Sequence, residues 1–307
     1  MALSAIRTRG GGDLVISRGL VTQRANDERL PAQTIERDYI LANVCADVGA
    51  VGDARLVFKG GTLLRLCYFE DYRYSADLDF SALEGLTAAD AIAIVGAAVT
   101  ACRHRIEAPT LEVSDTDGGT AWISYVGPLG SRPRRIKLDI SDDELVESHH
   151  RLRLYQRWPD LPGDASIEAY TLDEAGAEKL RCIAERVQGR DLYDLHEMLE
   201  GQQFDAMAAW HLYLRKAAND VTRGRQRTPP QGGPPPSTAT WLPTVIGGAR
   251  SWGTTCRLCP ASATSSAGAD AISVPSSLPP RLFRTGKPLP DDPDPSCPLD
   301  YLDPALT

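Results

Sequence analysis

The sequence predicts an α+β fold, in which a mixed β-sheet with flanking helices is followed by a C-terminal helical part. Short segments that alternate polar and apolar residues lie before residue 145, and three segments with helical spacing of apolar residues lie after residue 171. The apolar fraction of 42% is ordinary and provides for a sizeable core. Sixteen of the 22 prolines lie beyond Arg223, so the folded part is expected to end near that residue.

The elements follow in chain order. Ile35, Tyr39 and Val44 have helical spacing and predict a helix over 34–47, with Thr34 as its N-cap. The next elements expected are a strand over 55–58, a Gly60-Gly61-Thr62 turn, a short helix over 63–68 and a strand over 77–81. They are followed by an Ala-rich helix over 87–105, strands over 111–114, 121–126 and 134–140, and helices over 172–186, 191–199 and 204–218.

This pattern divides the chain into four regions. They are an N-terminal arm (1–33), an α/β core (34–145), a helical part completing the site (146–221) and a Pro/Gly/Ser-rich tail (222–307). The tail lacks apolar periodicity and is expected to be disordered, although a shifted reading frame in GC-rich DNA would produce the same bias. Cys256 and Cys259 have the spacing of a zinc ligand pair, but no histidine follows them and Cys297 is distant, so zinc is disfavoured.

Charge and cysteine usage restrict the class of protein. The net charge of −8 argues against a nucleic-acid coat protein, although it leaves room for a local basic groove. The sequence has neither a membrane-spanning apolar run nor a signal peptide at its N-terminus. Its seven scattered cysteines are typical of reduced thiols, so a cytoplasmic location is expected.

The segment from Lys59 to Thr62 has the composition of a phosphate-binding turn. Gly60 and Gly61 let the backbone approach a ligand closely, and the helix that follows presents free N–H groups. Thr62 adds a hydroxyl group. An ordinary tight turn would have the same two glycines.

Three aspartates are candidate metal ligands. Asp77 and Asp79 lie two residues apart on an expected strand and therefore point to the same face, while Leu78 between them points to the core. Two adjacent carboxylates repel each other unless a cation lies between them, and Mg²⁺ prefers such oxygen ligands. If the strand that carries Asp139 lies beside them, the three aspartates would hold two metal ions. The alternative is a solvated strand at the sheet edge.

The motifs resemble those of a known family. Phe58-Lys-Gly-Gly-Thr-Leu-Leu-Arg-Leu66 and Arg73-Tyr-Ser-Ala-Asp-Leu-Asp-Phe80 are similar to the signature of AbiEii/AbiGii nucleotidyltransferase toxins, including the mycobacterial Men-type branch. These toxins belong to the DNA polymerase β-like nucleotidyltransferase superfamily. The resemblance extends from about residue 34 to 218, excludes the tail, and implies a nucleotidyltransferase-like sheet.

A later motif completes the resemblance. It consists of Glu178-Lys179-Leu180, then Arg186, then Arg190-Asp191-Leu-Tyr-Asp194. In one continuous helix, Lys179, Arg186 and Arg190 would share a face suited to a triphosphate. Asp191 and Asp194, one turn apart, would orient these cations. An ordinary surface helix with ion pairs is the alternative reading.

The resemblance implies roles for these positions. Asp77, Asp79 and Asp139 would bind metal, Lys179 would contact nucleotide phosphates, and Asp191 would be needed for activity. The residues expected to act in catalysis are Asp77, Asp79, Asp139, Lys179 and Asp191. The residues expected to bind the nucleotide are Lys59, Gly60, Gly61, Thr62, Arg73, Ser75, Lys179, Arg186, Arg190 and Asp194.

The function implied is that of a toxin in a toxin–antitoxin system. With Mg²⁺, in two ions, it would transfer a nucleoside monophosphate from an NTP to the 3′ end of tRNA and so block translation and growth. The antitoxin would be a winged-helix AbiEi-type protein. A protein or small-molecule acceptor, and nucleotide binding without turnover, remain alternatives. A basic patch formed by Arg132, Arg134, Arg135, Lys137, Arg151, Arg153 and Arg157 would suit RNA, but a solvated sheet edge is equally consistent with it.

Overall fold

A computed structural model describes residues 6–8, 14–102, 106–114, 118–130, 132–186, 188–201 and 204–223. The predicted tail beyond Arg223, including Cys256 and Cys259, lies outside the described residues. In the described part, no helix is both long and apolar enough to span a membrane.

Seven strands form one mixed sheet in the order β5-β6-β7-β4-β3-β9-β8. Their bounds are β3 Leu56–Lys59, β4 Leu78–Ala82, β5 Glu107–Val113, β6 Thr120–Val126, β7 Arg134–Ser141, β8 His149–Arg153 and β9 Ser166–Tyr170. Strand β4 is central: it runs parallel to β7 on one side and antiparallel to β3 on the other. Strands β1 (Ile6–Thr8) and β2 (Leu14–Ile16) form a separate antiparallel pair. The α+β prediction is confirmed.

The helices are α1 Arg18–Glu28, α2 Ala32–Val51, α3 Gly60–Leu63, the π-helical turn η1 Leu64–Tyr68, α4 Ala88–Ala101, α5 Leu172–Glu185, α6 Gly189–Glu200 and α7 Ala206–Thr222. Helix α2 begins at Ala32 after Pro31, so Thr34 lies inside the helix and is not the predicted N-cap. The sequence analysis missed α1, β8 and β9. Helix α1 buries only Val21 and Ala25, so its apolar signal is weak. Strands β8 and β9 lie within the segment 146–221 that was expected to be helical.

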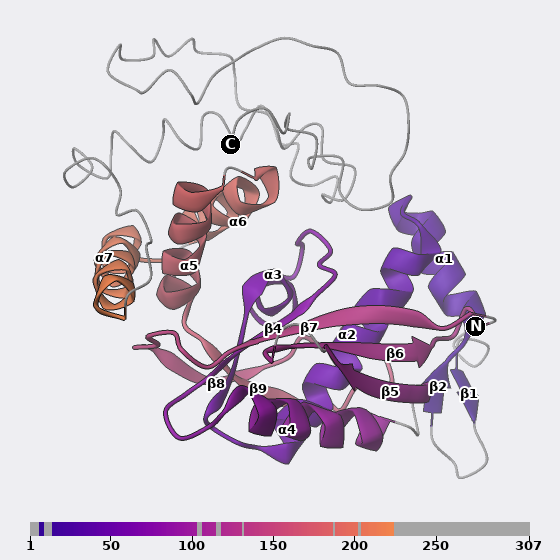
Figure 1. The fold of residues 1–307 in the computed structure, drawn as a ribbon. Helices are drawn as coiled ribbons and strands as arrows, with labels where there is room; N and C mark the ends of the chain where they lie inside the picture. Colours follow the sequence, from indigo (N-terminus) through magenta and orange to yellow (C-terminus); the bar gives the residue numbers. More distant parts are fainter. Residues whose placement is uncertain are drawn as a thin grey trace, which may run out of the picture.

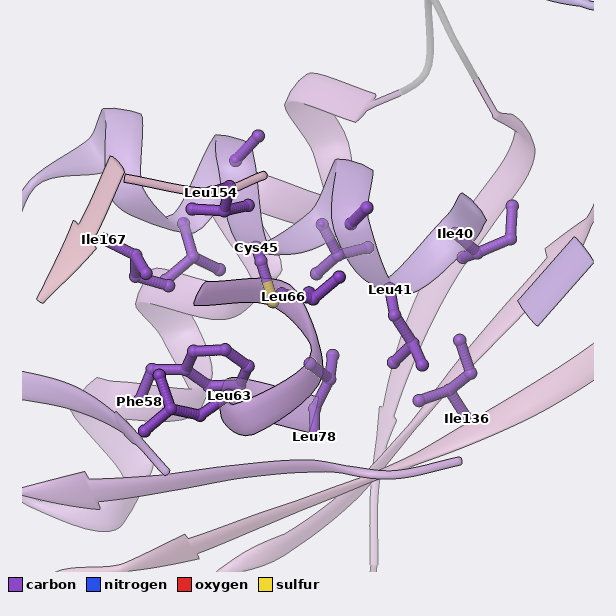
Figure 2. Close-up of a cluster of buried hydrophobic side chains, with 14 of the residues drawn as sticks. Ile40, Leu41, Cys45, Phe58, Leu63, Leu66, Leu78, Ile136, Leu154 and Ile167 are labelled. Atoms are coloured by element: carbon purple, nitrogen blue, oxygen red, sulfur yellow. The ribbon is translucent and has the colours of Figure 1, made fainter. Parts of the chain in front are cut away.

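The two faces of the sheet differ in character because residues alternate along each strand. One face carries Phe58, Phe80 and Leu138, which are fully buried. Figure 2 shows Phe58 and Leu78 in one apolar cluster with Cys45 of α2 and Leu66 of η1. This face contributes most of the hydrophobic core, which fixes the positions of β3 and β4.

The opposite face is polar and lies against the C-terminal helices. Helices α5, α6 and α7 gather in one part of the molecule, away from α4 (Figure 1). Lys216 of α7 is buried and pairs with Glu174 at 2.6 Å and Glu178 at 3.0 Å, both on α5. Its Nζ also lies 5.2 Å from the ring centre of Tyr170 at the end of β9. These contacts fasten the helices over the polar face.

Candidate active site

Asp79 lies in the centre of the polar face. It pairs in register with Lys59 of β3 on one side and with Asp139 of β7 on the other. The condition for bringing the three aspartates together, that the two strands be neighbours, is therefore met. The alternative of a solvated strand at the sheet edge is wrong, because β4 is an interior strand.

The charge around these aspartates is incompletely compensated. Burial, together with the neighbouring charges of Asp77 and Asp139, raises the pKa of Asp79 to about 6, against the opposing charges of Lys59 and Lys179. Burial and the charge of Asp139 also raise the pKa of Asp77, against the charges of Arg190, Arg37 and Lys137. The cations near these two buried carboxylates thus do not fully balance their negative charge.

Gly60 and Gly61 make room for the site. Gly60 has a φ of +80°, and a Cβ there would lie 2.3 Å from Oδ2 of Asp79. A Cβ on Gly61 would lie 2.7 Å from Nη2 of Arg73 and 3.2 Å from Oγ of Ser75. The backbone of Gly60 and Gly61 therefore lies close to side chains of the site itself, which are Asp79, Arg73 and Ser75.

Two residues expected to hold phosphate are engaged elsewhere. The Thr62 hydroxyl is buried and donates to the carbonyl of Asp77 at 2.6 Å, which fixes the start of β4. The Lys59 ammonium donates to Ser141 Oγ at 3.1 Å and forms an ion pair with Glu144. Lys59 therefore supports the site from within the sheet, and its positive charge still acts on Asp79.

The later motif lies on two helices, in agreement with the predicted helices over 172–186 and 191–199, so the condition for a common cationic face is not met. Helix α5 ends at Glu185 and α6 begins at Gly189, which removes the common face of Lys179, Arg186 and Arg190. Asp191 and Asp194 are both fully buried on α6, so the surface-helix alternative is also wrong.

The two aspartates of α6 orient cations as predicted. Lys179 Nζ lies 3.1 Å from Asp191 and 2.7 Å from Asp194. Arg73 donates to both oxygens of Asp194 at 2.6 Å, and Tyr72 donates to the same carboxylate at 2.6 Å. Although burial alone would raise it, Arg73 and Lys179 hold the pKa of Asp194 well below its usual range. The exposed Arg186 lies 3.6 Å from Asp191.

A family model described as nucleotidyl transferase AbiEii toxin, Type IV TA system, matches residues 47–273, well over half of the chain. The chain belongs to the AbiEii toxins. The match continues past Arg223, so the expected end of the resemblance near residue 218 was wrong. No curated protein matches the chain in sequence.

A solved structure supports the fold of this AbiEii chain. It is similar to MenT4, a nucleotidyltransferase toxin of Mycobacterium tuberculosis, with a TM-score of 0.60 and 24% identity over 76% of this chain and 88% of that chain. JHP933 from Helicobacter pylori matches with a TM-score of 0.44 and 18% identity over 63% of this chain and 78% of that chain. At this identity, the likeness to MenT4 shows the fold.

The donor set of the AbiEii site is compatible with Mg²⁺. Mg²⁺ usually takes one or two carboxylates and completes its shell with water and substrate phosphates. Asp77 and Asp79 are two such carboxylates, and their raised pKa values indicate missing positive charge. Asp139 is already bound by Lys137 at 2.8 Å and by the Thr120 hydroxyl at 2.9 Å. Accordingly, among the described residues no group of three or more His, Cys, Asp or Glu side chains is arranged to hold a metal ion.

The basic residues of β7 and β8 do not form one patch. Strands β4, β3 and β9 lie between them. Arg134 pairs with Glu36 at 2.6 Å, and Arg135 pairs with Glu112. Arg157 is engaged with the carbonyls of Arg65, Phe69 and Glu70 near η1. His149 lies in β8, and its Nδ1 lies 2.8 Å from Oε1 of Glu168.

The sequence analysis missed three residues around the site: Glu144, Tyr72 and Arg37. Glu144 holds Lys59, and Tyr72 donates to Asp194. Arg37 of α2 is close enough for its charge to act on Asp77. Nothing in the local pattern distinguishes Arg37 from the other charged residues of its helix, because its role depends on the packing of α2 beside the sheet.

Proposed function

We propose that this AbiEii toxin transfers a nucleoside monophosphate from an NTP to the 3′ end of tRNA in a Mg²⁺-dependent reaction, and so stops translation and growth. The observation that carries the proposal is the position of Asp77 and Asp79. Both are half-buried, and their negative charge is only partly balanced by nearby cations, among them Lys179. Asp191 and Asp194 hold Lys179 in place. A site that only binds nucleotide has no need for such a carboxylate pair.

Each part of the site has a task in this reaction. Asp77 and Asp79 would hold Mg²⁺, and Asp139 would become a third ligand, giving sites for two ions, only after it leaves Lys137. Bound Mg²⁺ supplies charge neutralisation on the triphosphate and polarises the attacking oxygen. Lys179 binds phosphate oxygens, and Asp191 and Asp194 keep its ammonium group in position. Catalysis then rests on positioning and on charge stabilisation.

The remaining motif residues support this arrangement. The backbone at Gly60 and Gly61 approaches the triphosphate beside Ser75. Arg190 adds positive charge near Asp77. Asp139 accepts the proton of the attacking hydroxyl once it is released from Lys137. Arg186, which is exposed at the break between α5 and α6, would contact an outer phosphate of the nucleotide.

The partners follow from the family. The NTP is the nucleotide donor, and tRNA is the acceptor we favour for a toxin that arrests growth. The antitoxin is proposed to be a winged-helix AbiEi-type protein, and the reaction is proposed to take place in the cytoplasm.

The test is a transfer assay with purified protein, Mg²⁺, total tRNA and each α-labelled NTP in turn. Label is expected in tRNA with the native protein and is expected to be absent with Asp77→Ala and without Mg²⁺. Label in protein or in a small molecule would retain the chemistry and change the acceptor. Nucleotide binding without pyrophosphate release would refute the transferase proposal.

A further inference from the structure

The side chain of Lys59 crosses the strand that carries Asp79. Lys59 is the last residue of β3 and pairs in register with Asp79 of β4, yet its ammonium donates to Oγ of Ser141 on β7 at 3.1 Å. Strand β4 lies between β3 and β7, so the lysine reaches past its neighbouring strand to the next one. Adjacent strands lie about 4.8 Å apart, so this reach takes most of the length of a lysine side chain.

Asp79 lies beside the start of this lysine side chain and does not receive its ammonium. Gly60 directly follows Lys59, and a Cβ on Gly60 would lie 2.3 Å from Oδ2 of Asp79. The carboxylate is thus next to the backbone from which the lysine extends. Even so, no hydrogen bond or ion pair joins Lys59 and Asp79, both of which belong to the described residues. The lysine that pairs with Asp79 in the sheet therefore gives its donors to other groups.

Glu144 is the counter-ion that holds the lysine in this position. It forms an ion pair with Lys59, and both side chains are 10% exposed. The same carboxylate oxygen accepts the hydroxyl of Ser81 at 3.0 Å and lies 3.4 Å from the hydroxyl of Tyr170. Charge-assisted hydrogen bonds are about twice as strong as neutral ones, so Glu144 outweighs Ser141 in fixing the ammonium.

The segment that carries Glu144 is fastened by the last helix. It joins β7 to β8, and Arg223 at the end of α7 donates to the carbonyl of Asp143 at 2.8 Å. Arg215 of α7 forms an ion pair with Glu147 of the same segment at 2.7 Å. The position of the Glu144 carboxylate therefore depends on α7 and not on the strands alone.

We propose that Glu144 is a positioning residue for the metal site: it holds the Lys59 ammonium away from Asp79 and so leaves this carboxylate available to Mg²⁺. An ammonium paired with Asp79 would occupy the oxygens that a metal ion needs, and its positive charge would repel the ion. This inference rests on the proposed function, because it takes Mg²⁺ as the ion that Asp77 and Asp79 bind. It assigns a role in that site to a residue outside the motifs.

The test measures, at constant pH, how Mg²⁺ raises the unfolding midpoint of the native protein and of variants of the ion pair. Glu144→Gln keeps the shape of the side chain and loses its charge, so the Lys59 ammonium should move to Asp79. The Mg²⁺ concentration that raises the midpoint by a given amount should then increase about ten-fold. The double variant Lys59→Met, Glu144→Gln has no ammonium to compete, so its Mg²⁺ requirement should return to within about two-fold of the native value.

Glu36→Gln is the matched control. Glu36 is also a buried glutamate in an ion pair, which it forms with Arg134 at 2.6 Å, at the end of β7 away from Ser141. This change should lower the midpoint without Mg²⁺ and leave the Mg²⁺ requirement unchanged. If Glu144→Gln does not fold, Glu144→Asp carries the test, because its shorter side chain holds Lys59 less well and should raise the requirement in the same direction.

The outcomes separate this role from the function on which it rests. An unchanged Mg²⁺ requirement in the Glu144 variants would overturn the inference alone. So would a double variant with the same weakened response as Glu144→Gln, because a purely structural role of Glu144 is not restored by removing the lysine. Absence of any Mg²⁺ response in the native protein would contradict the proposed Mg²⁺-dependent function and this role with it.

Discussion

Two pairs of aspartates meet at this site, and they are in opposite electrostatic states. Asp194 on α6 is fully buried and receives hydrogen bonds from Arg73, Lys179 and Tyr72, so its pKa lies well below the usual range. Asp79 on β4 is buried and lies near the carboxylates of Asp77 and Asp139, so its pKa is raised to about 6. The pKa of Asp77 is raised as well. Asp191 contacts the same lysine, Lys179, as Asp194 does.

The difference separates a part of the site that is complete from a part that is prepared for a ligand. The negative charge of Asp191 and Asp194 is balanced within the protein, and the ion pairs link α5, α6 and the segment that holds Arg73. The β4 pair has more negative charge than the cations around it in the described residues balance, which suits it to a bound cation. A structural acid and a functional acid can thus be distinguished by whether the fold already supplies its counter-ion.

The largest expected effect comes from Asp194→Asn. The change leaves the buried Arg73 without a carboxylate partner and Lys179 with Asp191 alone, so we expect a loss of about 3–5 kcal/mol in the free energy of unfolding. Because the native pKa of Asp194 is depressed, its stabilisation is present above the unfolded pKa and is lost as pH falls through the folded value. Denaturant unfolding near neutral pH measures the effect.

Asp164→Asn is the control for that experiment. Asp164 is exposed in a turn, and the change should alter stability by less than about 0.5 kcal/mol. A similarly small loss for Asp194→Asn would mean that the α6 cluster is not the complete ionic unit described above.

The second effect has the opposite sign. Asp79→Asn removes a carboxylate whose ionised form is disfavoured, so it should stabilise the metal-free protein by about 2 kcal/mol at pH 7.5 while abolishing transfer. A raised pKa means that native stability is greater below the unfolded pKa and is lost as pH rises through about 6. The gain from the substitution should therefore disappear near pH 4.

Mg²⁺ sharpens this second test. The ion should raise the unfolding midpoint of the native protein and leave that of Asp79→Asn unchanged, because binding to the folded state alone stabilises it. A destabilised Asp79→Asn variant at pH 7.5 would show that the β4 pair is already balanced by the chain itself.

The sequence predicted those parts of the site that depend on residues close together in the chain, and not those that depend on distant partners. The alternation of Leu78 and Phe80 with the aspartates predicted β4 and the common face of Asp77 and Asp79, since both follow from strand geometry alone. Its interior position depends on pairing with both β3 and β7, and the order of strands in the sheet does not follow from the local sequence pattern. The ion pairs of Lys59 with Glu144 and of Arg73 with Asp194 could not be predicted, because the partners are distant in the chain.

A third, smaller effect is expected from Gly60→Ala. Gly60 and Gly85 have nearly the same positive φ, +80° and +82°, so an alanine at either position has a similar backbone cost. A Cβ at Gly60 also collides with Asp79, whereas one at Gly85 meets only Arg55 at 3.9 Å. Gly60→Ala should cost about 1 kcal/mol more than Gly85→Ala and should reduce transfer, which Gly85→Ala should not. Equal losses in stability and activity would show that the close approach to Asp79 is unimportant.

The smallest effect is expected from ending the chain at Arg223. Both aspartate pairs, and the contacts of Lys216 with Glu174 and Glu178, lie within the described residues up to Arg223. Arg223 itself donates to the carbonyl of Asp143 at 2.8 Å, which anchors the end of α7. The shortened protein should remain soluble, unfold cooperatively and keep its response to Mg²⁺. Since the family match continues to residue 273, an insoluble product would show instead that residues 224–273 belong to the folded unit that holds the site together.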